Sequence, residues 1–135
     1  MATFEWDERY STGIPLIDKQ HKELFKTMGR LNEAFKRGRG HQELGQVLDY
    51  LARYTLEHFD AEEAYMKRIA FPDMRSHFLE HQILTQKVLE LQNRYLFEDP
   101  AVGMTTSQLL YEWLRNHILQ KDFAYILHAR ETHQL

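Results

Sequence analysis

Four long segments of the chain carry apolar residues at the i, i+3, i+4, i+7 spacing of a helix that is buried on one side. These segments span residues 18–37, 41–69, 73–96 and 105–130. Glycine and proline, which interrupt helices, lie mainly outside them, as in Arg37-Gly38-Arg39-Gly40 and at Pro72 and Pro100. No run alternates strictly between apolar and polar residues as a half-buried strand would. We therefore predict an all-α protein, an up-down-up-down four-helix bundle.

The first 17 residues precede the first stripe and are predicted to form a non-helical N-terminal arm on the outside of the bundle. Asp18 is expected to cap the first helix. A chain of 135 residues has the size of one domain, so we predict a single domain over residues 1–135.

Charge and hydropathy exclude several classes of partner. The formal net charge is -3, which gives no basic field to hold nucleic acid or an anionic membrane surface. No window approaches the roughly 18 apolar residues of a membrane-spanning helix. The N-terminus also lacks the basic and apolar regions of a secretory signal. We expect a cytoplasmic monomer with no nucleic-acid partner and no membrane insertion.

The chain has eight histidines and no cysteine. The absence of cysteine excludes disulfides, thiolate zinc sites, cysteine-ligated iron–sulfur clusters and cysteine nucleophiles. Five histidines fall on the apolar stripes: His21, His58, His77, His81 and His117. The remaining three, His41, His128 and His133, are expected to be surface or terminal residues.

The spacing of these residues predicts shared directions. Residues four apart on an α-helix lie about one turn apart, so His58 and Glu62 form one pair aimed at the bundle centre and His77 and His81 form another. Asp122 follows His117 by five residues, an offset of about 140° on an α-helix, and spacing supports it least as a ligand.

Other acidic residues near these pairs are expected on the solvent face. Glu63 is rotated by about 100° from Glu62 on an α-helix and should therefore be solvated. Glu57, Asp60 and Glu80 are expected to be solvated in the same way.

A single histidine on an apolar stripe is more often a hydrogen-bonded core residue than a metal ligand. The complete set is different, because five buried imidazoles and a buried carboxylate each need a partner in one small core. A shared metal centre would supply these partners together. The nitrogen and oxygen donors favour iron or manganese, and the number of ligands suits two ions better than one tetrahedral zinc. Neither the Glu-x-x-His motif of ferritin-type di-iron proteins nor the His-Glu-x-x-His motif of zincins occurs.

The motifs resemble those of the hemerythrin family in its single-domain bacterial form. The matching elements are Gly13-Ile14-Pro15, Ile17-Asp18 through Gln20-His21, His58-Phe59-x-x-Glu62-Glu63, His77-x-x-x-His81 and Trp113-Leu114-x-x-His117-Ile118-x-x-x-Asp122. They follow one another in the family's order and cover the arm and all four predicted helices.

The resemblance implies a non-haem di-iron centre, Fe2+ or Fe3+, with an oxo or hydroxo bridge. The implied metal ligands are His21, His58, Glu62, His77, His81, His117 and Asp122. Three of the histidines, at 77, 81 and 117, would bind one iron and the other two would bind the second. Glu62 and Asp122 would bridge the irons.

The implied function is reversible O2 binding, as a hydroperoxide on the five-coordinate iron, for carriage, storage or delivery. No catalytic residue is implied, and the protein is expected not to be an enzyme. An O2 pocket is expected from Phe59, Trp113, Leu114 and Ile118, although ordinary core packing explains these four positions equally well. The alternatives are a di-iron enzyme with peroxidase-like or oxidase-like activity, an NO scavenger, or an O2 sensor acting through a separate partner protein.

Overall fold

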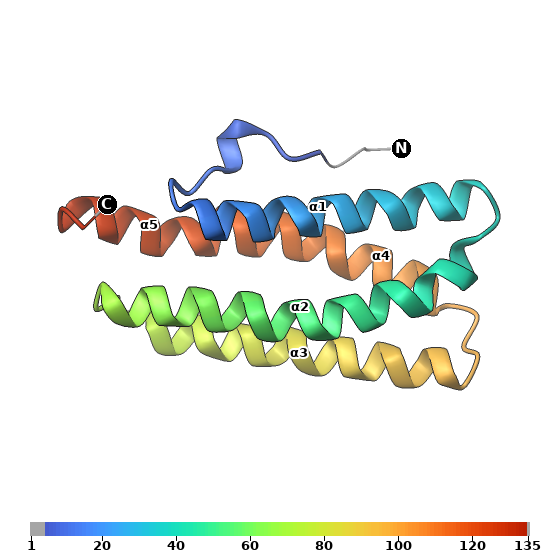
Figure 1. Cartoon of the computed structure of the whole chain (residues 1–135). Helices are drawn as coiled ribbons and strands as arrows, with labels where there is room; N and C mark the ends of the chain where they lie inside the picture. The colour runs from blue at the N-terminus through green and yellow to red at the C-terminus, as the bar shows by residue number, and fades with distance from the viewer. Residues whose placement is uncertain (1–4, 135) are drawn as a thin grey trace.

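The computed structural model describes residues 5–134, without the side chains of Leu114 and Leu119. After a short 3-10 turn, η1 (Glu8–Tyr10), the chain forms α1 (Pro15–Lys36), α2 (Gly40–Arg68) and α3 (Met74–Leu96). The fourth helix is continuous but composite, with α4 (Val102–Trp113), a π-helical segment η2 (Leu114–Asp122) and α5 (Phe123–Glu131). The helices run alternately up and down the bundle (Figure 1), which confirms the predicted all-α four-helix fold.

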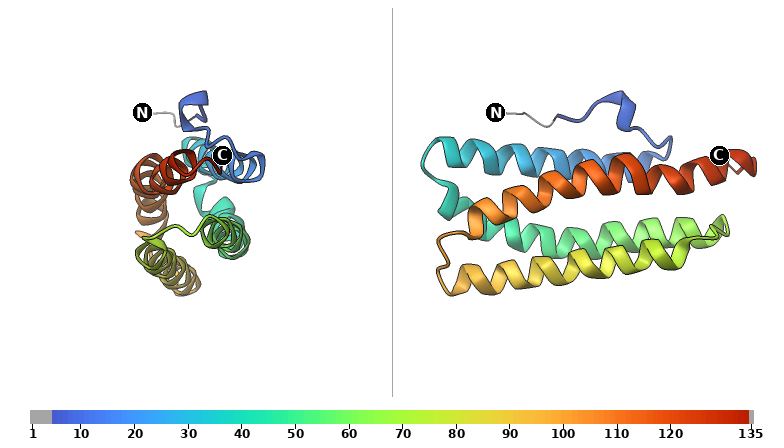
Figure 2. Two further views of the ribbon diagram at one scale, coloured as in Figure 1. Left: turned by 90° about the vertical axis from the view of Figure 1, so that its left-hand side faces the viewer. Right: turned by 180° about the vertical axis from the view of Figure 1, so that it is seen from behind.

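Each helix packs against two neighbours. The neighbouring pairs are α1 with α2, α2 with α3, α3 with α4, and α1 with α4, and α2 also contacts α4 across the bundle. An end-on view shows the four helices around one axis, with the N-terminal arm outside α1 (Figure 2). Among the described residues, no helix is long and apolar enough to cross a membrane.

The first helix begins at Pro15, three residues before the expected start. Proline suits the first turn, because its fixed φ matches the helix and its missing N–H has no helical partner there. Asp18 therefore lies inside the helix and does not cap it. Its carboxylate accepts hydrogen bonds from the Ser11 hydroxyl (2.6 Å), the Thr12 amide (2.7 Å) and the Thr12 hydroxyl (2.8 Å). These bonds tie the arm to the start of the bundle.

At the opposite end, the α1–α2 connection turns at Gly38, whose φ of +73° suits glycine. Gly40 is the first residue of α2 and Gly103 the second of α4, and both backbones lie directly against the ring of Phe35. A side chain at either glycine would collide with that ring, so the two glycines allow α1, α2 and α4 to converge.

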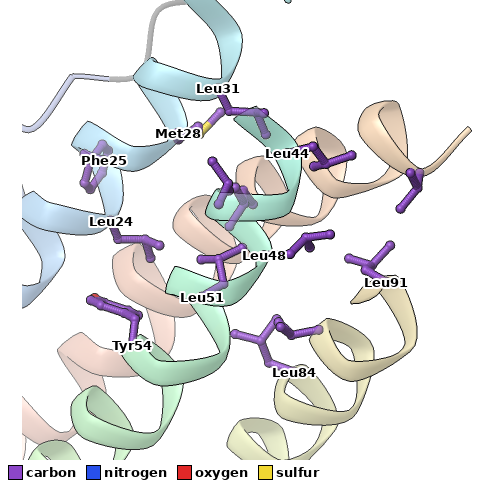
Figure 3. Packing of buried hydrophobic residues seen from close by; sticks show 14 of the residues in the cluster. Leu24, Phe25, Met28, Leu31, Leu44, Leu48, Leu51, Tyr54, Leu84 and Leu91 are labelled. Carbon is purple, nitrogen blue, oxygen red and sulfur yellow. The ribbon is translucent and has the colours of Figure 1, made fainter. Parts of the chain in front are cut away.

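Two hydrophobic clusters fill the bundle. The larger contains 16 buried residues and extends toward the α1–α2 connection, where leucines of α1, α2 and α3 meet (Figure 3). The smaller lies at the end that holds the α2–α3 connection, and its buried members are Tyr65, Met66, Ile69, Tyr125, Ile126 and Ala129. A layer of buried polar side chains separates the two clusters.

Candidate metal centre

The seven residues predicted as ligands lie together in this polar layer. They come from all four helices of the bundle: His21 from α1, His58 and Glu62 from α2, His77 and His81 from α3, and His117 and Asp122 from η2. All are buried, with at most 4% of the residue surface exposed. Each therefore needs an internal partner for its polar atoms.

Their ligand atoms form two overlapping groups. Glu62, His77, His81 and His117 make up the three-histidine group, and His21, His58, Glu62 and Asp122 make up the two-histidine group. Within each group the ligand atoms lie within 4.8 Å of one another. Glu62 belongs to both groups, which places two potential metal positions side by side.

Asp122 also faces both groups. Its Oδ2 lies 3.1 Å from His21 Nε2, while its Oδ1 lies 3.0 Å from His77 Nε2 and 2.9 Å from His117 Nε2. The two carboxylate oxygens are thus divided between the two histidine sets. This is the arrangement that a bridging carboxylate requires.

The π-helical segment explains how His117 and Asp122 meet although they are five residues apart. In an α-helix such residues point in different directions, but π-helical hydrogen bonds join residue i to residue i+5. Residues five apart then lie about one turn from each other. Helical spacing disfavours Asp122 only where the helix is α-helical, and at this point it is π-helical.

The two central carboxylates are held ionised. Burial alone would raise the pKa of Glu62, but the imidazoles of His58, His117 and His81 outweigh burial and hold the pKa well below its usual range. Burial and the charge of Glu62 also act to raise the pKa of Asp122, and the contacts of Asp122 with His117 and His21 outweigh them, lowering it to about 2.

Several polar atoms in the centre have no hydrogen-bond partner. They are His21 Nε2, His58 Nε2, His77 Nε2, Glu62 Oε1 and both carboxylate oxygens of Asp122. Leaving such atoms unpaired in a protein interior is costly. Metal ions placed among them would satisfy these atoms, and the donor set of imidazole and carboxylate suits iron or manganese. The residues present therefore fit the metal pair that the sequence predicts.

A second set of contacts surrounds the centre, and sequence reasoning missed it. His58 Nδ1 donates to the Gln20 side-chain oxygen (2.7 Å), and His81 Nδ1 donates to Glu63 Oε2 (2.8 Å). The Tyr125 hydroxyl donates to Glu62 Oε2 (2.7 Å). Metal-binding histidines usually donate their second ring N–H to such an acceptor, so a search for acceptors next to each ligand could have found the first two.

The expectation that Glu63 is solvated was wrong. Its side chain is 19% exposed and lies in the α2–α3 seam, where it meets His81. Glu80 is likewise only half-exposed, with Oε1 at 3.6 Å from Lys121 Nζ and Oε2 at 3.8 Å from His117 Nδ1. An angle on a helical wheel locates the Cα atom, but a flexible glutamate can reach around the helix to a buried donor.

Two of the expected O2-pocket residues stack on the three-histidine group. Phe59 lies on His81 with ring centroids 3.8 Å apart and planes 2° from parallel, and Trp113 lies on His117 at 3.8 Å and 13°. Phe59 also approaches His58 at 5.8 Å, so it lies near both groups. Ile118 is fully buried in the larger hydrophobic cluster, and the side chain of Leu114 lies outside the described structure.

The three histidines left out of the predicted ligand set lie away from the centre. His41 and His133 are exposed. His128 is half-buried, and its Nε2 lies 3.2 Å from the Ile69 carbonyl oxygen.

The fold and this polar layer define a class: a four-helix bundle whose core can hold metal through histidines and carboxylates. A family model, the hemerythrin HHE cation binding domain, matches residues 12–127. The chain therefore belongs to the hemerythrin family.

Relatives and solved structures agree with this assignment. The chain is 33% identical to a bacteriohemerythrin of Pseudomonas aeruginosa over 132 residues, which cover 98% of this chain and 85% of the relative. It is 30% identical to the bacteriohemerythrin of Methylococcus capsulatus over 126 residues, covering 93% and 95% of the two chains. A wild-type hemerythrin crystal structure superimposes with a TM-score of 0.80 at 30% identity, covering 92% of this chain and 95% of that one.

Proposed function

We propose that this protein binds O2 reversibly at a non-haem di-iron centre, for carriage, storage or delivery. The observation that carries the proposal is the pair of ligand groups joined by Glu62, with the two oxygens of Asp122 turned toward different histidine sets. A single tetrahedral ion would leave several of these buried donors without a partner.

The residues divide between two irons. His77, His81 and His117 would hold one iron, and His21 and His58 the other. Glu62 and Asp122 would bridge them, together with an oxo or hydroxo group. The second position has one imidazole fewer, which leaves room for an external ligand. When bound, the iron pair would supply the electrons that hold O2 reversibly.

The protein's own contribution is to bury this centre and surround it with apolar side chains. The hydrophobic clusters close the bundle on both sides of the polar layer. Burial raises the pKa of Tyr125 well above its usual range, so its hydroxyl stays protonated and donates to Glu62. Phe59 and Trp113 cover the histidine rings with apolar surface. These features support a binding protein more than an enzyme.

Iron content and an oxygenation spectrum test the proposal. The iron-loaded protein should contain two irons per chain and show an absorption band that appears with O2 and disappears when O2 is removed. His58→Ala should lose this reversible change, whereas His41→Ala, the same substitution at an exposed site of the same helix, should keep it. One zinc per chain, or a band that O2 removal does not reverse, would contradict the proposal.

A further inference from the structure

Each proposed histidine ligand has one ring nitrogen, Nδ1, that faces away from the centre. The hydrogen-bond partner of this outer nitrogen differs between the two groups. In the three-histidine group, His81 Nδ1 donates to a carboxylate oxygen of Glu63 at 2.8 Å. In the two-histidine group, His58 Nδ1 donates to the neutral amide oxygen of Gln20 at 2.7 Å. Both bonds direct Nε2 of the ring toward the centre. The two partners therefore orient the rings alike but differ by one negative charge.

The remaining outer contacts extend the difference. Glu80 Oε2 lies 3.8 Å from His117 Nδ1, although Lys121 partly balances its charge. This separation is too long for a hydrogen bond, so His117 Nδ1 has no hydrogen-bond partner, and neither has the buried His21 Nδ1 of the other group. Among the described residues, the three-histidine group thus has two outer carboxylates and the two-histidine group has none. Because Glu63 is largely buried, solvent screens its charge only in part.

We propose that these outer partners add to the inequality that three imidazoles against two already create between the metal positions. Glu63, supported by Glu80, makes the three-histidine position the tighter-binding and less easily reduced one, while Gln20 leaves the two-histidine position more electron-poor. This inference rests on the proposed di-iron function and goes beyond it, because it names the residues that rank the two positions.

The physical reason lies in the hydrogen bond itself. A carboxylate that accepts the N–H of a ligating imidazole makes the other ring nitrogen a more basic donor, whereas an amide oxygen does so less. A more basic donor binds a cation more tightly and stabilises its higher charge state. The electron-poor position would be the one with room for an external ligand, and it would attract ligands that carry negative charge. Glu63 and Gln20 are positioning residues in this scheme, since both act through a histidine.

Exchanging the two partners tests the inference with matched variants. Glu63→Gln removes the charge and keeps the shape of the side chain, and Gln20→Glu does the reverse in the other group. Glu57→Gln is the control, because it removes the same charge from an exposed position of α2. The first probe is Zn2+, titrated into the metal-free protein against a competing chelator, so that no redox chemistry intervenes.

We expect two binding steps in the wild-type protein. Glu63→Gln should weaken the tighter step by about 10–100-fold and leave the weaker step in place. Gln20→Glu should strengthen the weaker step, and Glu57→Gln should change neither. In an anaerobic potentiometric titration of the iron-loaded protein, Glu63→Gln should raise one midpoint potential and Gln20→Glu should lower the other. A tenfold change in the relative affinity for the two oxidation states corresponds to about 59 mV for one electron.

The outcomes separate this inference from the proposed function. Two steps that Glu63→Gln weakens equally, or that Glu57→Gln weakens as much, would overturn the inference and leave the di-iron proposal standing. The same holds if Gln20→Glu weakens the step it should strengthen. One step that binds two Zn2+ ions per chain would likewise overturn the inference, whereas a total of one Zn2+ per chain would overturn the di-iron proposal itself. Circular dichroism checks that each metal-free variant folds. Glu63→Gln and Gln20→Glu are separate variants, so each tests the inference even if the other fails to fold.

Discussion

Tyr125 links the polar layer to the smaller hydrophobic cluster. Its side chain is fully buried, and its ring lies 5.7 Å from Tyr65 and 5.6 Å from His77. Its hydroxyl supplies the hydrogen bond to Glu62 Oε2, while Glu62 Oε1 faces the histidines. One oxygen of this carboxylate is thus held by protein and the other is left for the centre.

Tyr125→Phe should destabilise the metal-free protein by about 1–3 kcal/mol, because it leaves a buried carboxylate oxygen without its donor. Tyr65→Phe is the matched control, since the Tyr65 hydroxyl is also buried but has no hydrogen-bond partner. Urea unfolding of the two metal-free variants measures the difference. Equal unfolding free energies would show that the Tyr125 bond contributes nothing.

Asp122→Asn tests the bridging carboxylate. The substitution preserves shape but replaces one anionic oxygen with an NH2 group, which cannot bind a metal beside His21 or His77. We expect iron content to fall to one per chain or less, with a loss of affinity beyond the roughly 100-fold typical of an outer-contact change. Asp60→Asn, at an exposed site of α2, should retain wild-type iron content when both are measured by metal analysis.

For single residues, the sequence predicts the direction of the Cα position but not how far a flexible side chain extends from it. His58, Glu62, His77 and His81 could be placed from helical spacing because their Cα positions already face the centre. Glu63 could not, because its Cα lies off that face and only the side chain brings the carboxylate to His81. The signal available was chemical: a ligating imidazole needs an acceptor for its second N–H.

Among the elements, the fourth helix is the irregular one. Its first part, α4, and its last part, α5, are α-helical, but η2 between them is π-helical over nine residues. A constant period of 3.6 residues cannot describe such a helix. The apolar pattern predicted the helix correctly, but beyond residue 122 apolar residues lie on several faces, and the structure buries Tyr125 and Ile126 fully while Leu127 is 55% exposed.

The π-helical segment should depend on metal. π-helices are rare and short in proteins, and they occur mostly at functional sites. Here His117 lies near the middle of the segment and Asp122 is its last residue, so metal binding to both would hold the wide turn between them. We expect amide hydrogen exchange over residues 114–122 to quicken on metal removal far more than exchange over 102–113 in α4. Equal protection of the two segments in the metal-free protein would contradict this dependence.

In the whole molecule, the polar layer divides two hydrophobic clusters that are each continuous across several helices. The larger cluster accounts for the bundle's assembly near the α1–α2 connection (Figure 3). The polar layer adds little hydrophobic stabilisation, because its seven buried side chains are polar and their burial is costly without partners. Metal would therefore join the two halves of the bundle by bonds to every helix.

Metal removal should lower the stability of the entire bundle. A ligand present at 100 times its Kd stabilises a protein by about 2.7 kcal/mol, provided that it binds the folded state alone. For a domain of this size, each kcal/mol shifts the melting temperature by roughly 2–8 °C, so two occupied positions should raise it by about 10 °C or more. Differential scanning calorimetry of the iron-loaded and chelator-treated protein measures the shift.

In His58→Ala the shift should shrink, because one of the two imidazoles of the second position is lost. Coincident melting curves with and without iron would show that no metal joins the helices.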